Sequence, residues 1–348
     1  MIKIDGSNSG GQVLRTAIAL SALTNYPVKI MNIRKGKIDS KPGLRPQHMT
    51  GIEVMKKFCD AEVEGLHEWS TEILFKPSKI DVKSHRIDIG TAGSVTLLLQ
   101  TLLPVLIFSK KSLSLEIIGG TDVKWSPTIH YTSSVLLPFL KKMGVDVHIE
   151  IENYGFYPLG GGNIKIAVNP IKKLECVSLV QRGNVLGINI QSICGNLPAE
   201  IAERQNKTAM EILAKKYPKA KFSLVSTSTK SKSHGSSITC IGVCEKSLLG
   251  GSALGERGVR AEDVATNAAN ELIESLQSNN AVDKYMADQL LIFMALAKGK
   301  SKITVEKITD HVLTNIDVIE RFLPVKFEVE GSKNHEGIIS VEGVYFNQ

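Results

Sequence analysis

The sequence predicts an α+β protein made of repeated βαβαββ units, with a smaller α/β domain inserted between them. A segment that ends a helix and begins a strand occurs three times, centred on Phe58, Met143 and Phe322. The first two copies lie about 85 residues apart and the last two about 179, so about 94 residues of the second interval are additional. One repeated unit, with helices on one face of each sheet and a single insertion, accounts for this spacing.

Periodicity and turn residues give the order of elements inside each unit. Turns of small residues that open an apolar helix occur at residues 10–15, 91–96 and 286–291. The strand after each of these helices is predicted at residues 28–33, 114–118 and 303–306. A loop, a second helix and two final strands complete the unit.

The additional residues predict an inserted domain at 179–278, so that residues 1–178 and 279–348 form the large domain that carries the site. Within the insert, strands are predicted at 185–193, 222–226 and 237–243, and helices at 198–216 and 261–278. Residues 226–237 are rich in Ser, Thr and Lys and predict a mobile hairpin connection. Its lysines could contact nucleic acid, although such a run is more typical of a solvated loop.

Composition narrows the class of protein. The chain is 43% apolar and 22% charged, which is typical of a globular protein and excludes a disordered one. The apolar run at 97–108 is too short to span a bilayer, and the residues before Asp5 predict no secretory signal. The five cysteines show no paired metal spacing, so we expect reduced core residues in a cytoplasmic protein with no membrane partner.

The charge balance favours an acidic partner. The net charge is +7 and the isoelectric point is near 9.0, which suits nucleic acid or a phosphorylated small molecule. Only 5% of the residues are aromatic. A long platform that stacks many bases is therefore not expected, and contact with a short nucleic-acid end fits better.

His311 lies between a predicted strand and a predicted helix. The β-branched residues 303–305 precede it, and Val312, Ile316 and Ile319 recur at helical spacing after it. Backbone N–H groups at the start of a helix attract anions, and an imidazole placed there can act as base, ligand or nucleophile. A single loop histidine is more often structural, so His311 needs support from the rest of the chain.

Two loops near the N-terminus suit phosphate. Residues 5–12 form a glycine-rich turn that opens the helix carrying Arg15, and the backbone of such turns binds phosphate. A tight turn that needs glycine is the alternative. Residues 34–48 are basic and contain two prolines and two glycines, which favours arginines held for bidentate contact with oxyanions over solvated surface charges.

Two further loops suit a nucleotide base. In the third, residues 119–127, Trp125 and Pro127 offer flat apolar surfaces, although a loop aromatic is as often simple packing. The fourth, residues 285–289, opens the helix that leads to His311. Asp288 is expected to cap that helix. Equivalent loops of repeated units lie at the same edge of their sheets, so the four loops are expected to meet.

These motifs together resemble the RNA 3′-terminal phosphate cyclase family, and the resemblance extends over nearly the whole chain. The matching segments are Pro42-Gly43-Leu44-Arg45-Pro46-Gln47-His48, Gly119-Gly120-Thr121-Asp122, Phe156-Tyr157-Pro158-Leu159-Gly160-Gly161-Gly162, Leu254-Gly255-Glu256-Arg257-Gly258, Ala287-Asp288-Gln289 and His311-Val312-Leu313-Thr314-Asn315. The resemblance implies a large domain of βαβαββ units similar to that of enolpyruvyl transferases, with a smaller inserted domain.

The resemblance also implies adenylyl transfer. The histidine matching His311 attacks the α-phosphate of ATP, AMP passes to the RNA 3′-phosphate, and the adjacent 2′-OH displaces AMP to leave a 2′,3′-cyclic phosphodiester. The residues that match the nucleotide pocket are Gln100, Pro127, Tyr285, Met286, Ala287, Asp288 and Gln289, with adenine between Tyr285 and Pro127. The residues that match phosphate contacts are Gln12, Arg15, Arg34, Arg45, Gln47 and His48.

The chain departs from the family pattern in its first loop. Members usually carry there a glutamate linked to a divalent metal, whereas this loop reads Ser7-Asn8-Ser9-Gly10-Gly11. The metal ligands are therefore unassigned, with Asp5 and Asp122 the nearest candidates, and Mg²⁺ or Mn²⁺ is expected to arrive with ATP. Lys37 also stands where some members have arginine, which loses a bidentate fork.

Two other functions are compatible with the fold. A non-catalytic RNA-binding relative that serves ribosome assembly would lack the nucleophilic histidine, so His311 argues against it. An enolpyruvyl transferase would need neither His311 nor the motif at 285–289. The sequence does not reveal the RNA substrate or the oligomeric state.

Overall fold

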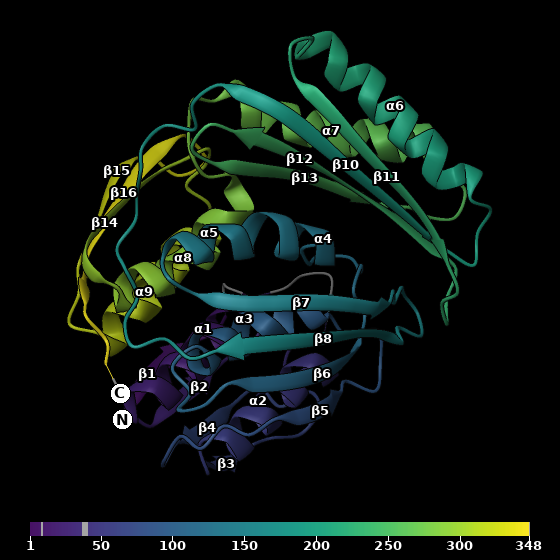
Figure 1. Cartoon of the computed structure of the whole chain (residues 1–348). Helices are drawn as coiled ribbons and strands as arrows, with labels where there is room; N and C mark the ends of the chain where they lie inside the picture. Colours follow the sequence, from purple (N-terminus) through teal and green to yellow (C-terminus); the bar gives the residue numbers. More distant parts are fainter. Residues whose placement is uncertain (8–9, 37–40, 348) are drawn as a thin grey trace.

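The computed structural model describes residues 1–7, 10–36 and 41–347. Its strands form four four-stranded sheets (Figure 1). Three of the sheets share one topology, in which the first strand runs parallel to the second, and the fourth strand lies between the second and the third, antiparallel to both. The repeated βαβαββ unit is thereby confirmed.

The first two units follow one another along the chain. The first consists of β1 (Ile2–Asp5), α1 (Gln12–Thr24), β2 (Val28–Met31), α2 (Pro46–Phe58), β3 (Glu62–Glu64) and β4 (Ile73–Lys76). The second consists of β5 (His85–Asp88), α3 (Val95–Leu106), β6 (Leu113–Gly119), α4 (Ile129–Tyr131), the π-helix η1 (Thr132–Leu136), α5 (Leu137–Lys142), β7 (Asp146–Asn153) and β8 (Gly162–Asn169). In β6 the apolar residues Leu113, Leu115 and Ile117 are buried and alternate with more exposed ones, so one face of the sheet is covered.

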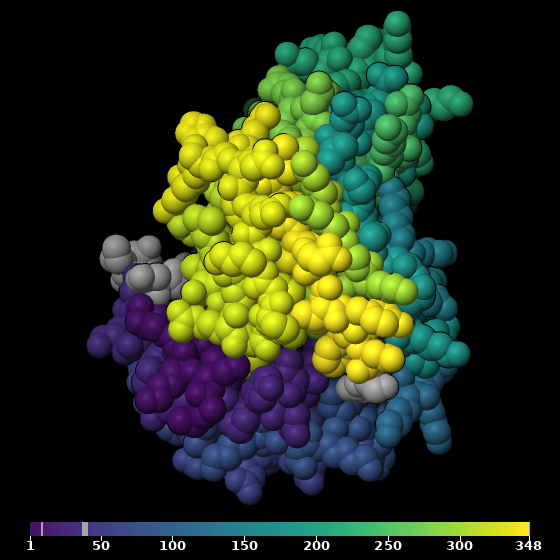
Figure 2. Space-filling view, turned by 90° about the vertical axis from the view of Figure 1, so that its left-hand side faces the viewer, coloured from purple at the N-terminus to yellow at the C-terminus, as the bar shows by residue number. Residues whose placement is uncertain are grey.

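The third unit is interrupted after its first strand. It consists of β9 (Ser178–Leu179), α8 (Lys284–Leu296), β14 (Lys298–Val305), α9 (Asp310–Phe322), β15 (Phe327–Gly331) and β16 (Gly337–Val344). Leu179 of β9 pairs in parallel with Ile303 of β14, so the first strand of this unit precedes the insertion. Figure 2 shows the third unit between the first unit and the inserted elements.

The inserted elements form the fourth sheet, with α6 and α7 on one face (Figure 1). They are β10 (Val185–Gly195), α6 (Glu200–Lys216), β11 (Lys221–Thr229), β12 (Gly235–Cys244), β13 (Leu248–Leu254) and α7 (Ala261–Gln277). Strand β13 was not expected from the sequence. The domain limits of 179 and 278 stay a prediction.

The expected hairpin between residues 226 and 237 is wrong. Strand β11 pairs with β10 in parallel, while β12 pairs with the other side of β10 in antiparallel orientation. The two strands are therefore neighbours in sequence only, and β10 lies between them. The connection is also anchored, because Ser231 Oγ donates to the carbonyl of Tyr154 at 3.0 Å and Ser233 Oγ accepts from the N–H of Leu159 at 3.0 Å.

The helices of the three units meet in the interior. Helix α1 contacts α2, α3 and α9, and α8 contacts α3 and α9, so helices from different units pack against one another. A second, separate core cluster lies under α6 and α7 and includes Ile188, Ala209 and Leu272. In the described part of the chain, no helix combines the length and apolar character needed to cross a membrane.

Candidate active site

The first helices of the three units converge on one polar cluster. Arg15 in α1 donates from Nε to Gln100 Oε1 in α3 at 3.1 Å. Gln100 donates in turn from Nε2 to Gln289 Oε1 in α8 at 3.0 Å. The structure thus joins a residue predicted to bind phosphate to two that were predicted to bind the nucleotide.

Asp288 is the acidic member of this cluster. Its carboxylate accepts a hydrogen bond from Gln12 Nε2 and interacts electrostatically with Arg15. Burial raises the pKa of Asp288 to about 6, against the opposing effect of Gln12 and Arg15. Burial likewise lowers the pKa of Arg15 to about 10, while Asp288 acts to raise it. At neutral pH the pair is therefore ionised.

The expectation that Asp288 caps its helix is wrong. The cap of α8 is Asp283, whose Oδ1 accepts from the N–H groups of Tyr285 and Met286 at 3.0 and 2.9 Å. Asp283 also accepts from Tyr131 Oη at 2.6 Å and from the N–H of Gly250 in β13 at 3.0 Å. Asp288 lies one turn further along and is directed at α1, where it holds Gln12 and Arg15.

Three arginines surround the imidazole of His48. His48 is 7% exposed, and its pKa is lowered to about 3 by burial and by the positive charges of Arg15, Arg34 and Arg45. The ring is therefore neutral at physiological pH. Its Nδ1 accepts from the N–H of Arg45 at 3.2 Å, which leaves the proton on Nε2 as a donor.

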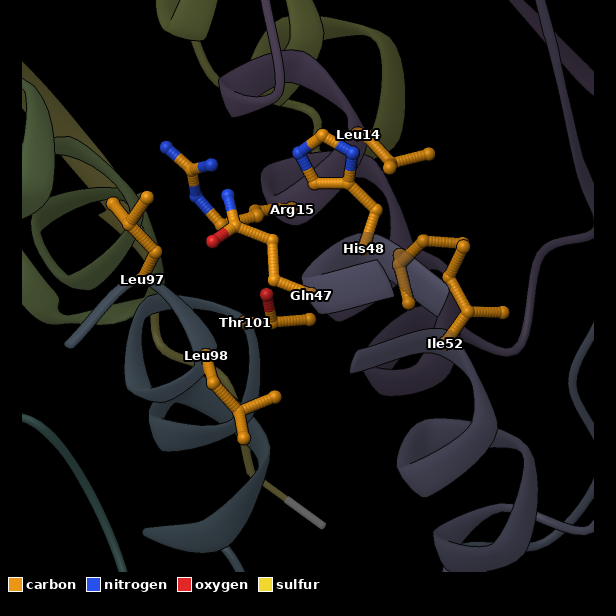
Figure 3. Close-up of a pocket in the computed structure, with 9 residues that line it drawn as sticks. Leu14, Arg15, Gln47, His48, Ile52, Leu97, Leu98 and Thr101 are labelled. Carbon is orange, nitrogen blue, oxygen red and sulfur yellow. The ribbon is translucent and has the colours of Figure 1, made fainter. Parts of the chain in front are cut away.

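The neutral ring faces the glycine-rich first loop. A Cβ at Gly11 would collide with Nε2 of His48 and would lie 3.1 Å from a terminal nitrogen of Arg15, so glycine allows this close approach. Figure 3 shows Arg15, Gln47 and His48 projecting from α1 and α2 into one pocket. Gln47 Oε1 accepts from the N–H of Ser94 at 3.0 Å, which fixes the start of α2 against the start of α3.

Trp69 is a contributor to the site that the sequence did not suggest. The guanidinium carbon of Arg45 lies 3.7 Å from the centre of the Trp69 ring, within cation–π distance. The backbone of Trp69 packs so closely on Gly43 that a Cβ there would lie 2.8 Å from the Trp69 Cα. The Trp69 ring thus supports the Arg45 guanidinium at the edge of the cluster.

His311 lies at the second residue of α9 and is exposed. Thr309 caps the helix, its hydroxyl accepting from the N–H of Val312 at 3.2 Å. One turn further, Asn315 accepts from Thr16 of α1 at 2.8 Å and donates to the carbonyl of Asp288 at 2.9 Å. The helix that carries His311 is therefore hydrogen-bonded to both helices that carry the Arg15–Asp288 pair.

The remaining nucleotide residues differ in accessibility. The Tyr285 side chain is 42% exposed and its hydroxyl donates to Glu271 of α7. Pro127 lies beside α3, where its carbonyl accepts from Thr96 at 2.9 Å. Met286 and Ala287 are fully buried in the core, and their N–H groups donate to Asp283. Adenine between Tyr285 and Pro127 stays a prediction.

A metal site is not assembled by the described residues. Among residues 1–7, 10–36 and 41–347, no three His, Cys, Asp or Glu side chains are grouped as metal ligands. Asp5 accepts from the N–H of Ser7 at 3.0 Å, and Asp122 is buried and accepts from the Thr121 hydroxyl at 2.6 Å. Asn8, Ser9 and Lys37 lie outside the described residues.

By its fold and this cluster, the chain is an α+β protein with a polar site suited to phosphate groups, in which three arginines act on one region. The helix that carries His311 near its start is hydrogen-bonded to two of the helices that form this site. The model of the RNA 3′-terminal phosphate cyclase family matches residues 7–329. An RNA 3′-terminal phosphate cyclase of Pyrobaculum aerophilum is 41% identical and aligns over 100% of this chain and 99% of its own. The chain belongs to the RNA 3′-terminal phosphate cyclase family.

Other relatives support the same family assignment. Proteins with the same name from Pyrococcus abyssi and Methanosarcina barkeri are 43% and 44% identical, and each alignment covers 98% of this chain and 98% and 99% of theirs. A solved EPSP synthase from Acinetobacter baumannii aligns with 98% of this chain and 64% of its own, at a TM-score of 0.25 and 9% identity. The fold is defined by the sheet topology described above.

Proposed function

We propose that this chain is an ATP-dependent RNA 3′-terminal phosphate cyclase. The family match over nearly the whole chain supports this activity. The observation that carries it in the structure is the tether of the His311 helix to the arginine cluster through Asn315. A nucleophile held beside fixed cations is what transfer of a nucleotidyl group requires.

The arginine cluster would hold the phosphates. Arg15, Arg34 and Arg45 each lower the pKa of His48, so the three positive charges act on one small region. Repulsion within such a group favours an anion as its counter-charge. His48 adds a neutral N–H donor and no charge of its own, and Gln12 and Gln47 complete the set of candidate phosphate contacts.

His311 would perform the covalent step. A neutral imidazole nitrogen attacks the α-phosphorus of ATP, forming an N–P bond as the bond to the pyrophosphate oxygen breaks. An oxygen of the RNA 3′-phosphate then takes AMP from the histidine. Finally, the adjacent 2′-OH loses its proton and attacks the 3′-phosphorus, AMP leaves, and the cyclic phosphodiester remains. The positive end of the α9 helix dipole favours negative charge beside His311.

The nucleotide pocket would lie between the helix starts. Gln100, Gln289 and Asp288 form the polar side of this pocket, and Tyr285 and Pro127 would enclose the base. Divalent metal would enter bound to the ATP phosphates, since the described carboxylates and histidines do not form a ligand set.

Transfer of label from ATP tests the proposal. Incubation with ATP labelled at the α-phosphate should leave labelled AMP on the protein, and His311→Ala should abolish the label while the variant still folds. His335, which is exposed in the loop packed against Ile308, provides a matched control, and His335→Ala should label like wild type. Labelling of the His311 variant would refute the assignment, and the absence of label from wild type would favour the non-catalytic RNA-binding alternative.

A further inference from the structure

Three loops of the large domain meet at the edge next to Gln47. A Cβ at Gly93 would lie 3.0 Å from Gln47 Cβ. A Cβ at Gly160 would lie 2.8 Å from the Cα of Ala92, and one at Gly120 would lie 2.6 Å from the Ala92 carbonyl. The loops at 91–93, 119–127 and 154–161 therefore pack backbone to backbone, beginning beside a candidate phosphate contact.

Large apolar side chains project from these loops into solvent. Trp125 is 94% exposed, Tyr157 77% and Leu159 62%. Trp125 also has a φ of +62°, a conformation that is unfavourable for a bulky residue and that concentrates at functional sites. Burial cannot be the reason for a strained, fully exposed tryptophan.

A cation lies beside these side chains. The connection between β11 and β12 descends to the end of the β7–β8 pair (Figure 1), where Ser231 and Ser233 bond to the 154–161 loop. Lys232, between them, lays its aliphatic stem across Gly161, since a Cβ at Gly161 would collide with it. Lys232 is exposed, so its ammonium group can reach solvent next to the apolar side chains. Phe156 anchors the contact against Gly195 and Gly235.

Resting on the cyclase function proposed above, we propose that Trp125, Tyr157, Leu159 and Lys232, here named the rim, bind the single-stranded RNA that precedes the 3′-phosphate. Exposed aromatic rings stack bases without regard to sequence, and a lysine beside them pairs with the phosphate backbone. The rim begins at the loop that touches Gln47, and Trp125 stands two residues before Pro127. A strand whose last phosphate lies in the arginine cluster can therefore continue over the rim.

The net charge and the aromatic content of the chain favour single-stranded RNA as the ligand of the rim. The chain carries a net charge of +7, which favours an anionic polymer. The rings of Trp125 and Tyr157 can stack two bases, which agrees with the low aromatic content of the chain. The flexible end of an RNA offers unstacked bases that such rings can take up.

Binding of two phosphorylated ligands tests the rim. The probes are a single-stranded, 3′-phosphorylated oligoribonucleotide of about ten nucleotides and a 3′-phosphorylated dinucleotide, each followed by fluorescence anisotropy. Trp125→Ala or Tyr157→Ala should raise the oligonucleotide Kd about 5-fold to about 140-fold. Binding of the dinucleotide should change less than about twofold. Lys232→Ala should make the slope of log affinity against log salt shallower by about 0.7, as for one phosphate contact.

Control variants distinguish the loss of base stacking at the rim from a general effect of removing an exposed side chain. Tyr26 is 56% exposed at the opposite end of α1 from Gln12, and Lys219 is exposed at the opposite end of β11 from Lys232. Tyr26→Ala and Lys219→Ala should leave both affinities unchanged. Trp125→Phe keeps a ring and should bind the oligonucleotide within about threefold of wild type if stacking of a base on the aromatic ring is the cause.

Labelling with ATP separates this proposal from the function on which it rests. Tyr157→Ala and Lys232→Ala should still acquire AMP at the wild-type level, since Tyr157 and Lys232 are not among the residues of the proposed nucleotide pocket. A wild-type chain that binds RNA through the rim and takes no AMP would refute the cyclase function alone. Unchanged oligonucleotide affinity in both aromatic variants, or an equal loss for the dinucleotide, would overturn the rim, and the first result would leave the surface to a protein partner.

Discussion

Removing the imidazole of His48 should change how stability depends on pH. The folded-state pKa of His48 is about 3, whereas an unfolded chain has a histidine pKa of about 6.5. A depressed folded pKa gives stability that is fully present above the unfolded pKa and is lost as pH falls toward the folded pKa. Wild type should therefore lose stability between about pH 6.5 and pH 3 because the buried ring resists protonation.

The size of this loss follows from the two pKa values. Each pH unit between them corresponds to about 1.4 kcal/mol, so between pH 7 and pH 5 His48 should cost wild type about 2 kcal/mol of unfolding free energy. In His48→Asn the amide oxygen can still accept from the N–H of Arg45, and nothing titrates at this position. Asp122, Asp283 and Asp288, whose pKa values are raised to about 6, act in the opposite direction. They are present in both proteins and cancel in the comparison.

Urea unfolding at pH 7, 6 and 5 measures the effect. The difference in unfolding free energy between wild type and His48→Asn should shrink by about 2 kcal/mol from pH 7 to pH 5. The exposed His67 provides the control, and His67→Asn should follow wild type at every pH. Parallel curves for wild type and His48→Asn would show that burial and the three arginines do not hold His48 neutral, and the account of the cluster would fail.

Three further changes test individual contacts. Trp69→Leu should weaken binding of a 3′-phosphorylated oligonucleotide about 2- to 30-fold by removing the cation–π contact of Arg45. Trp69→Phe should have an intermediate affinity. Equal affinities of wild type and both variants would show that the contact does not contribute to binding. Tyr285→Ala should weaken ATP binding by about 1 to 3 kcal/mol, whereas Tyr285→Phe should bind normally because its hydroxyl serves Glu271; unchanged affinity in the alanine variant would remove the ring from the pocket. Calorimetric titration of Mg²⁺ or Mn²⁺ into nucleotide-free wild-type protein should show no tight stoichiometric binding. Tight binding would mean that other residues form a metal site. Ser9→Glu should lower the metal concentration needed for half-maximal labelling by ATP.

The repeated unit could be predicted because its signal is periodic. The copies at Phe58, Met143 and Phe322 fix both the unit and the interruption, and the sheet topology agrees with them. The hairpin between β11 and β12 could not be predicted in this way. Which side of β10 a strand joins depends on long-range pairing, and a turn-rich segment says only that the chain reverses. Its anchoring on the 154–161 loop lies in contacts between segments about 75 residues apart.

In the site, too, some contacts could be predicted from the sequence and others could not. The meeting of Arg15, Gln100 and Gln289 could be expected, because equivalent loops of repeated units share an edge. Asp283 also could have been found, since an aspartate just before a predicted helix is the ordinary cap. No local pattern connects Trp69 with Arg45, and the short stretch around Trp69 gives no periodicity to interpret.

The cluster requires all three units, which explains why each copy of the same helix start carries different side chains. The first two turns of α1 provide Gln12 and Arg15, those of α3 provide Gln100, and those of α8 provide Asp288 and Gln289. Repetition places the first two turns of three helices around one polar cluster. Sequence divergence between the units then gives each of these helices a different polar side chain. Asn315 links the second helix of the third unit to this arrangement through Thr16 and Asp288, so the position of His311 is determined by the packing of the units rather than by its own loop.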